Sequence, residues 1–176
     1  SGIVFDKVEI EAADVPFGIG SGSGVIFGVT GGVTEAVLRR LQQGHNRVDM
    51  ESIKKSGVRG DDGIKVLTYN YNGREIKAAV VNGLANADKV LQQIKNHEAE
   101  YDFVEVMACR RGCIMGGGQP VNAGPRTRKA RMKGLYDTDV NTQIKKSNEN
   151  PMILSLYDTL LKGKEHELLH RNFSGK

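Results

Sequence analysis

The strongest constraint on the fold is a pair of apolar runs joined by Asn72-Gly73. Residues 64–71 and 74–81 read as strands, and Asn-Gly is the dipeptide that best fits a two-residue turn between antiparallel strands. A helix is predicted over residues 85–96, followed by another apolar strand over residues 102–107. The inward face of this helix is expected to comprise Ala87, Val90, Leu91 and Ile94. These elements predict an α/β fold with a mainly parallel sheet, flanking helices and one hairpin.

The N-terminal part of the chain is rich in glycine. Residues 3–15 predict a short strand or an extended lead-in, and residues 16–24 predict a glycine–serine loop that matches no nucleotide-binding fingerprint. Residues 25–27 predict a short strand. Thr30-Gly31-Gly32 then opens a helix, and its expected apolar face comprises Val33, Ala36, Val37 and Leu41. A strand, a glycine turn and a helix N-terminus suit an anion or a cofactor, but a packed α/β turn is the favoured interpretation.

The last predicted strand leads into the run MACRRGCIMGGGQP, residues 107–120. The run holds both cysteines of the chain, Cys109 and Cys113, and the consecutive glycines Gly116, Gly117 and Gly118. Thiolates are the ligands that iron–sulfur clusters and zinc select, and glycine lets the backbone approach such a group closely. Buried cysteines, a redox dithiol and a structural zinc site are alternatives. CxxxC is not the usual redox spacing, however, and zinc lacks two nearby ligands, so ligation completed by another segment is favoured.

The C-terminal part predicts a helical tail. Its first helix carries a basic cluster that comprises Arg126, Arg128, Lys129, Arg131 and Lys133. This cluster is interpreted as a solvated helix face rather than a nucleic-acid surface or a docking face for an acidic electron carrier. Asn150-Pro151 predicts a capped helix start. The apolar stripe of that helix is expected to comprise Ile153, Leu156, Tyr157, Leu160 and Leu161, and a short final helix covers residues 165–170.

His166 and His170 stand four residues apart in HELLH, which fits the HExxH pattern of zinc proteases. The sequence offers no further ligand after them, so a surface helix is the favoured interpretation. His45 and His97 lie in polar loops and are expected to be solvated.

Composition narrows the function classes. The 176 residues suit one domain with a substantial core, and 39% hydrophobic and 26% charged residues are an ordinary soluble profile. A net charge of +4 without tryptophan argues against a nucleic-acid partner. No apolar run is long enough for membrane insertion, and no signal peptide is recognised. Two cysteines in a glycine-rich loop suit cytosolic ligand or redox chemistry rather than a disulfide framework, so a cytoplasmic location is expected.

Taken together, these segments resemble the [FeFe]-hydrogenases, or iron-only hydrogenases. MACRRGCIMGGGQP resembles their third cysteine motif, MACPGGCxxGGGQP. Further segments that resemble the family in the same order are GSGVIFGVTGGVTEAVLR, AAVVNGLANADKVL, EYDFVEV, RTRKARMKGLYDTD, KKSNENPMILSLYD and HELLH. The resemblance implies that residues 1–125 form the second α/β lobe of a two-lobed catalytic domain. It implies that residues 126–176 form a helical tail similar to the hydrogenase small subunit, which counts against the zinc protease.

The resemblance also implies a cofactor, the H-cluster, in which a [4Fe-4S] cubane is linked through one cysteine sulfur to a two-iron subcluster. By motif position, Cys109 would be a cubane ligand, Cys113 the catalytic bridging ligand, and Met107 would pack against the two-iron subcluster. The same pocket would be lined by Phe27, Gly28, Thr30, Gly31, Gly32, Gly116, Gly117 and Gly118. The other two cubane cysteines belong to family motifs of TSCCP and MPCxxK type, which this sequence lacks.

The implied activity is the reversible reduction of protons to hydrogen by the whole catalytic domain. The implied partners are the missing N-terminal half, a ferredoxin or similar acidic electron carrier, and maturation proteins. The chain alone is expected to be inactive and to bind no cluster, because half of the cluster ligands are absent. A hydrogenase-like iron–sulfur assembly protein and a sensory hydrogenase relative are the alternatives.

Arg110-Arg111 departs from the family pattern, which has Pro-Gly between the cysteines. Without proline the loop has more conformational freedom. Two positive charges that face a cluster unpaired should raise its reduction potential, because they favour the more negative, reduced state. The alternative is that both arginines point to solvent or pair with carboxylates.

Overall fold

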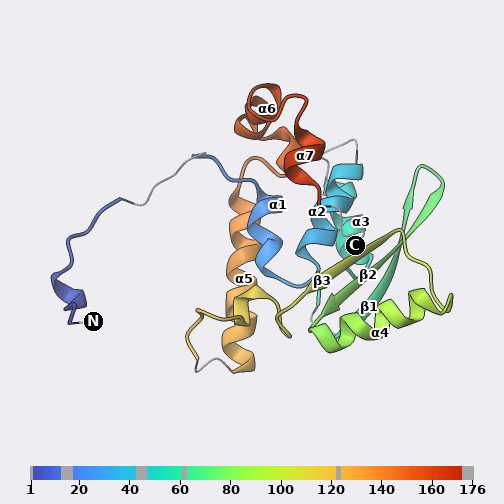
Figure 1. Cartoon of the computed structure of the whole chain (residues 1–176), viewed down its shortest axis with the longest axis horizontal. Coiled ribbons are helices and arrows are strands. Elements are labelled where there is room, and N and C mark those ends of the chain that lie inside the picture. Colours follow the sequence, from blue (N-terminus) through green and yellow to red (C-terminus); the bar gives the residue numbers. More distant parts are fainter. Residues whose placement is uncertain (1, 13–17, 43–46, 61–62, 122–123, 172–176) are drawn as a thin grey trace.

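The predicted hairpin, helix and strand form the sheet layer of the molecule. The computed structural model describes residues 2–12, 18–42, 47–60, 63–121 and 124–171. Strands β1 (Ile64–Tyr71), β2 (Arg74–Asn82) and β3 (Phe103–Met107) form one sheet in that order (Figure 1). Asn72 and Gly73 have φ values of 50° and 79°, as a type I′ hairpin turn requires. Helix α4 (Leu84–Lys95) connects β2 to β3.

The α/β class is confirmed, and the sheet is mixed. β1 pairs antiparallel with β2, and β2 pairs parallel with β3. The described sheet is therefore not mainly parallel, because the hairpin supplies two of its three strands.

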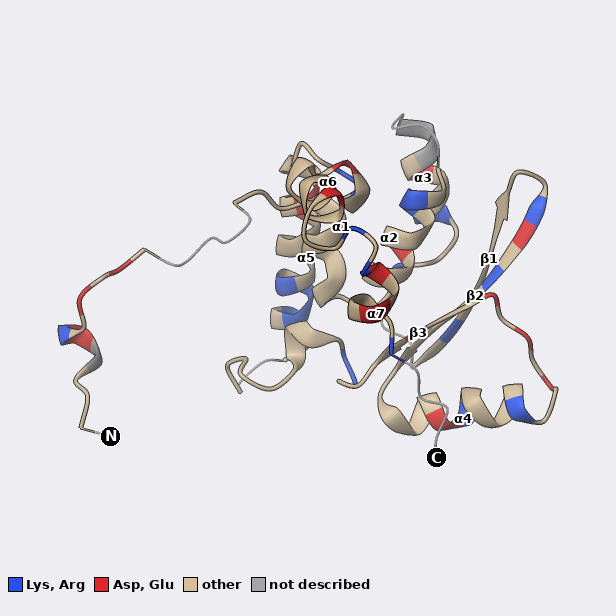
Figure 2. Cartoon of the chain, turned by 45° about the horizontal axis from the view of Figure 1, so that its top comes forward, with Lys and Arg blue, Asp and Glu red and all other residues tan. Residues whose placement is uncertain are grey.

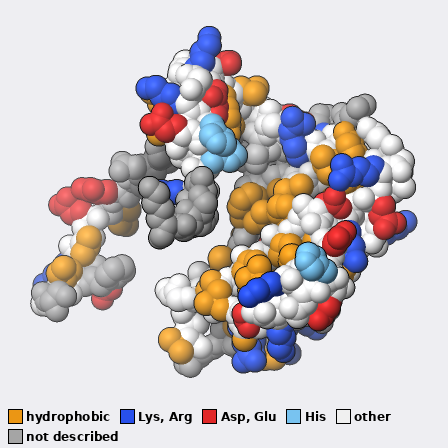
Figure 3. Space-filling model, turned by 45° about the vertical axis from the view of Figure 1, so that its right-hand side comes forward, with side chains coloured by type: hydrophobic (Ala, Val, Ile, Leu, Met, Phe, Trp, Pro, Cys, Tyr) orange, Lys and Arg blue, Asp and Glu red, His pale blue; other side chains and the backbone are white. Residues whose placement is uncertain are grey.

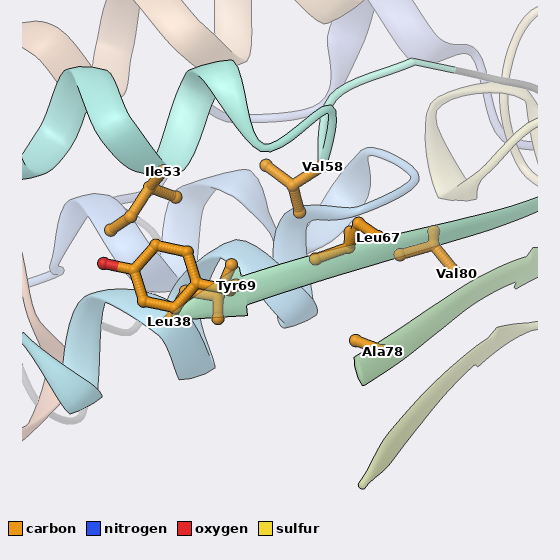
Figure 4. Packing of buried hydrophobic residues seen from close by; sticks show 7 residues of the cluster. All are labelled: Leu38, Ile53, Val58, Leu67, Tyr69, Ala78 and Val80. Carbon is orange, nitrogen blue, oxygen red and sulfur yellow. The ribbon is translucent and has the colours of Figure 1, made fainter. Parts of the chain in front are cut away.

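The second half of the central strand β2, residues 78–82, is buried on both faces, and its side chains alternate between two cores. Ala78 and Val80 pack beneath helices α2 (Gly32–Leu41) and α3 (Arg47–Lys55), whereas Ala79 and Val81 pack against α4. Figure 4 shows the first core, which comprises Leu38, Ile53, Val58, Leu67, Tyr69, Ala78 and Val80. On α4 the predicted inward face is right for Ala87 and Val90, but Leu91 is 58% exposed and Ile94 is 36% exposed.

The N-terminal part is helical where a strand was predicted. Gly22–Val25 forms the short helix α1, and Ile26–Gly28 forms the 3-10 turn η2, so the strand prediction for residues 25–27 is wrong. An apolar run this short has no period that separates a strand from a buried helical turn. Ser21 caps α1 by accepting a hydrogen bond from the Gly24 amide. The described lead-in, residues 2–12, contains only the turn η1 (Phe5–Lys7).

The helical tail lies against the N-terminal helices. Helix α5 (Pro125–Asn141) runs beside α1, and the turn η4 (Ser147–Glu149), α6 (Pro151–Asp158) and α7 (Glu165–Leu169) follow it (Figure 1). The Asn150 side chain accepts a hydrogen bond from the Met152 amide, which confirms the predicted cap. Because α6 ends at Asp158, Leu160 falls outside the stripe and is 72% exposed, whereas Leu161 is buried. In the described residues, no helix combines the length and apolar character needed to cross a membrane.

Candidate functional site

The cysteine loop begins where the parallel strand β3 ends. Cys109 is half-buried and Cys113 is exposed, and both are free thiols. Cys113 opens the 3-10 turn η3 (Cys113–Met115), and Gly112 before it has φ +77°, a conformation that glycine adopts readily. The carboxyl end of a parallel strand is where open α/β sheets carry their ligands. The strand therefore delivers both thiols to a position suited to a cofactor.

Two glycines allow this loop to fold tightly. A Cβ at Gly116 would lie 2.9 Å from the Cys109 Sγ, so glycine lets the backbone pass close to the thiol without displacing the sulfur. A Cβ at Gly112 would lie 3.2 Å from both the Gly28 carbonyl oxygen and the Thr30 Oγ1. The loop after the strand is thus packed on the turn at residues 28–30, although these segments are more than 80 residues apart.

The remaining glycines of the loop border open space. A Cβ at Gly117 or Gly118 would meet nothing within 4 Å, and φ of +86° favours glycine at Gly118. Together with Met115, Gln119 and Pro120 they line a hollow of about 370 Å³. Contact of these glycines with a cofactor stays a prediction.

The helix N-terminus at Gly31 is already occupied by the chain itself. The buried Glu105 carboxylate, on β3, accepts hydrogen bonds from the Gly31 amide at 2.8 Å and from the Thr34 amide and hydroxyl at 2.7 Å each. This carboxylate satisfies the amides that an external anion would need. The packed turn favoured from the sequence is therefore what the structure shows.

The predicted pocket residues differ in their surroundings. A Cβ at Gly31 would lie 2.0 Å from the Val58 carbonyl oxygen, and one at Gly32 would lie 1.8 Å from that of Ile26, so both glycines serve close backbone packing.

The Thr30 hydroxyl is buried and has no hydrogen-bond partner among the described residues. Met107, two residues before Cys109, is buried, whereas Phe27 is 46% exposed. Their contacts with a cofactor stay predictions.

A buried ionic cluster joins helices α2 and α5. The Arg39 guanidinium, fully buried on α2, donates to both carboxylate oxygens of Asp139 on α5, each at 2.7 Å, and to Glu35 at 2.6 Å. Burial alone would lower the pKa of Arg39, but its hydrogen bonds with Asp139 and the charge of Glu35 outweigh this effect and raise the pKa. Arg59 donates two further bonds to Glu35, at 2.8 and 2.7 Å.

Two members of the basic cluster on α5, Arg128 and Arg131, are half-buried rather than solvated. Arg131 donates a 2.7 Å hydrogen bond to the carbonyl oxygen of Ile114, the residue after Cys113, and it also lies 3.5 Å from that of Pro120. It therefore fastens the cysteine loop to α5. Arg126, Lys129 and Lys133 are exposed, as expected of a solvated face. Figure 2 shows Lys and Arg positions along α5 in blue.

Both arginines between the cysteines, Arg110 and Arg111, are exposed. Within the described ranges, neither takes part in an ion pair. Their effect on a cluster stays a prediction.

The described histidines form no metal centre with other described residues. His166 and His170 are exposed and stack with ring centroids 4.8 Å apart, and no group of three or more His, Cys, Asp or Glu side chains in the described part of the chain is placed to hold a metal. His97 is exposed as predicted, and His45 lies outside the described residues.

Sequence reasoning missed two supporting residues, Glu105 and Arg131. The signal for Glu105 is a single carboxylate inside the otherwise apolar strand FVEVM, since a charge at a buried position needs partners. No local signal separates Arg131 from the basic residues around it, because its partners are carbonyl groups of a distant loop.

The fold and the thiol-bearing loop define an α/β domain built to present two cysteines at one end of its sheet. The family model described as iron only hydrogenase large subunit, C-terminal domain, matches residues 1–117, and the model of the iron hydrogenase small subunit matches residues 125–176. The chain belongs to the iron-only hydrogenase family.

Individual relatives agree with this assignment. Iron hydrogenase 1 from Clostridium pasteurianum is 38% identical over 178 residues, which cover 96% of this chain and 31% of the relative. The periplasmic [Fe] hydrogenase large subunit from Nitratidesulfovibrio vulgaris is 42% identical over 124 residues, 70% of this chain and 30% of the relative. A solved [FeFe]-hydrogenase, HydA1 from Chlamydomonas reinhardtii, superposes with a TM-score of 0.60 at 33% identity and covers 97% of this chain. The chain thus spans about a third of these curated relatives and about half of that solved chain.

Proposed function

We propose that this chain supplies part of the H-cluster site of an [FeFe]-hydrogenase, an enzyme that interconverts protons and hydrogen. The observation that carries the proposal is the loop in which Gly116 leaves room for the Cys109 thiol and Cys113 stands exposed four residues further on. Family membership, which extends over nearly the whole chain, supports the proposal that these two thiols are cluster ligands.

The residues present fit the expected cofactor. Two thiolates match the ligand type that iron–sulfur clusters require, and the Gly116 position provides the close backbone approach. The buried Thr30 hydroxyl without a partner lies on the same side, against Gly112. In this proposal, Cys109 would supply a thiolate ligand to the cubane, and Cys113 would supply the catalytic thiolate ligand of the cofactor. The cofactor, when bound, supplies the electron storage and the open iron position for hydrogen chemistry.

The chain's own residues have supporting roles. Glu105 fixes the start of α2, so the turn carrying Gly28 and Thr30 keeps a constant position against the cysteine loop. Arg131 holds the backbone directly after Cys113. Met107 and Phe27 would add an apolar wall, which limits the access of water.

The test joins this chain to the rest of a catalytic polypeptide. The segment of Clostridium pasteurianum iron hydrogenase 1 outside the matched region would be co-expressed with the chain and reconstituted with iron, sulfide and the two-iron precursor. We expect a four-iron cluster and hydrogen evolution from the pair, neither from the chain alone, and loss of both with Cys113→Ser. A pair that forms without a cluster would show the proposal to be wrong.

The iron–sulfur assembly function is the second candidate. A probable cytosolic Fe-S cluster assembly factor from Aedes aegypti is 27% identical over 154 residues. The higher identity to hydrogenases favours hydrogen turnover. A cluster bound by the pair without any hydrogen evolution would favour the assembly function.

A further inference from the structure

Helix α2 buries its polar face and leaves its apolar face uncovered. Thr34, Glu35 and Arg39 are each no more than 1% exposed, because they bind Glu105, Arg59 and Asp139. The residues of the expected apolar face are only half-buried and line a groove: Val33, Ala36, Val37 and Leu41. The predicted helix and its single apolar face are confirmed, and this face lines the groove.

Helix α6 supplies further apolar residues that line the groove. Ile153, Leu154 and Tyr157 of α6 line the same groove, whose volume is about 680 Å³. Leu154 is 50% exposed and Tyr157 is 43% exposed. Figure 3 shows hydrophobic side chains gathered where the molecule is hollowed beside the C-terminal helices. Two facing helices with uncovered apolar residues form an interaction surface rather than an ordinary scatter of surface side chains.

We infer that this groove docks an amphipathic segment of the other part of the catalytic polypeptide, the part that carries the remaining cluster thiolates. The inference rests on the proposed function. The solved HydA1 chain is about twice the length that this chain covers, so a comparable amount of polypeptide is available to fill the groove.

The position of the groove agrees with that occupant. Phe27 is one of the residues that line it, and the next residue, Gly28, lies against the cysteine loop: a Cβ at Gly112 would be 3.2 Å from the Gly28 carbonyl oxygen. A segment seated in the groove would therefore emerge beside the thiols, where the missing ligands are needed. The exposed Arg40 also lines the groove, so a carboxylate next to the apolar ridge of the segment would match it.

The groove is poorly suited to a small molecule. Its polar lining residues are Arg40, Ser147 and Asn148, and the rest of its lining is apolar. A small-molecule site usually adds several polar groups that converge to fix the orientation of the ligand. An open apolar trough between two helices instead resembles a groove that receives the apolar face of a third.

The test measures association of cluster-free chain with the complementary hydrogenase segment, co-expressed so that both fold together. Val37→Asp and Leu154→Asp place a charge in the groove. Val140→Asp and Leu160→Asp place the same charge at exposed positions outside it, where Val140 is 67% exposed and Leu160 is 72% exposed. Urea unfolding of each variant checks that the chain itself stays folded.

We expect the groove variants to bind at least about tenfold more weakly and the controls to bind like wild type. Amides of α2 and α6 should gain protection from hydrogen exchange in the wild-type complex. Equal binding by groove variants and controls would overturn the inference, as would absence of any association. A dimer of this chain that Val37→Asp dissolves would also overturn it, since the occupant would then be a second copy. A complex that depends on Val37 but takes up no cluster would count against the proposed chemistry alone.

Discussion

At Gly116, a single hydrogen atom in place of a side chain leaves room for a thiol. A Cβ there would lie 2.9 Å from the Cys109 Sγ, closer than real Cβ contacts come. The sulfur can rotate away at small cost in stability, but it then points in another direction. Because the direction of a ligand governs metal affinity, a substitution at Gly116 tests whether the cysteine loop binds a cluster.

Gly116→Ala should lower the cluster affinity of the assembled protein about tenfold, the low end of the range for residues that orient metal ligands. Gly117→Ala is the matched control, since its Cβ would meet nothing within 4 Å. Iron content after reconstitution against a competing chelator gives the measurement. Equal iron content in both variants would mean that Cys109 does not hold the cluster.

Tyr136 offers a residue-scale prediction that needs no cofactor. Burial raises its pKa from 10.0 to about 12, and Arg59, whose guanidinium carbon lies 3.9 Å from the ring centroid, opposes that rise. The unfolded state ionises first, so the stabilisation by the neutral phenol is complete below pH 10.0 and is lost as pH rises through about 12. The loss should be on the order of 2–3 kcal/mol.

Tyr136→Phe should flatten the fall in the free energy of unfolding over that alkaline range. At neutral pH it should be close to neutral, because the buried Tyr136 hydroxyl has no hydrogen-bond partner among the described residues. Urea unfolding at stepped pH, with phenolate absorbance as a second signal, provides the data. An unchanged slope in the variant would contradict the assigned pKa.

At the scale of elements, the buried ion pair joins α2 to α5. Asp139 is 4% exposed and sits against Gly22, where a Cβ would lie 2.0 Å from its Oδ1. The pair thus brings three segments together: α1, α2 and α5. A buried charge without its partner is far more costly than the pair is stabilising.

Arg39→Leu should destabilise the chain by about 3–5 kcal/mol, because it leaves the Asp139 carboxylate buried without its ion-pair partner. Adding Asp139→Leu should recover a large part of that loss, since the double variant leaves no unpaired charge at this contact. Urea unfolding of both single variants and the double variant gives the coupling energy. Additive losses would show that the two side chains act independently.

The elements also show how far the sequence could predict the fold. The Asn72-Gly73 turn, the strand before Cys109 and the Asn150 cap follow from local chemistry, and each is confirmed. Helix α3 was not predicted. Its apolar residues are few, and Ile53 gains its burial from the distant β1 rather than from neighbours in sequence.

Sequence periodicity could not predict which face of α2 is buried in this chain, for a different reason. A hydrophobic stripe says that one face will be covered, but not by which polypeptide. Here Glu35 and Arg39 are buried because they neutralise each other and pair with charges from two other segments, Arg59 and Asp139, and the apolar stripe remains for another contact. The candidate thiols followed from the sequence, whereas Glu105 and Arg131 required the fold.

At the scale of the whole molecule, the two segments that match different family models are packed against each other. The large-subunit match ends at residue 117 and the small-subunit match begins at residue 125. Contacts between them include Arg39 with Asp139, the Gly22 amide with the Ile144 carbonyl oxygen at 2.8 Å, and Lys146 with the Gln42 carbonyl oxygen at 2.6 Å. These contacts do not depend on the linking residues 118–124.

The chain should therefore survive a cut in that link. A protease site inserted between Val121 and Gly124 should yield two pieces that elute together, because the buried ion pair and the backbone bonds hold α5 in place. Asp139→Leu should loosen the cut form, whereas Asp137→Leu, on the exposed side of the same helix, should not. Size-exclusion chromatography after cleavage reports the association. Separation of the wild-type pieces without denaturant would show that the link itself, rather than the interface, holds the small-subunit segment on the fold.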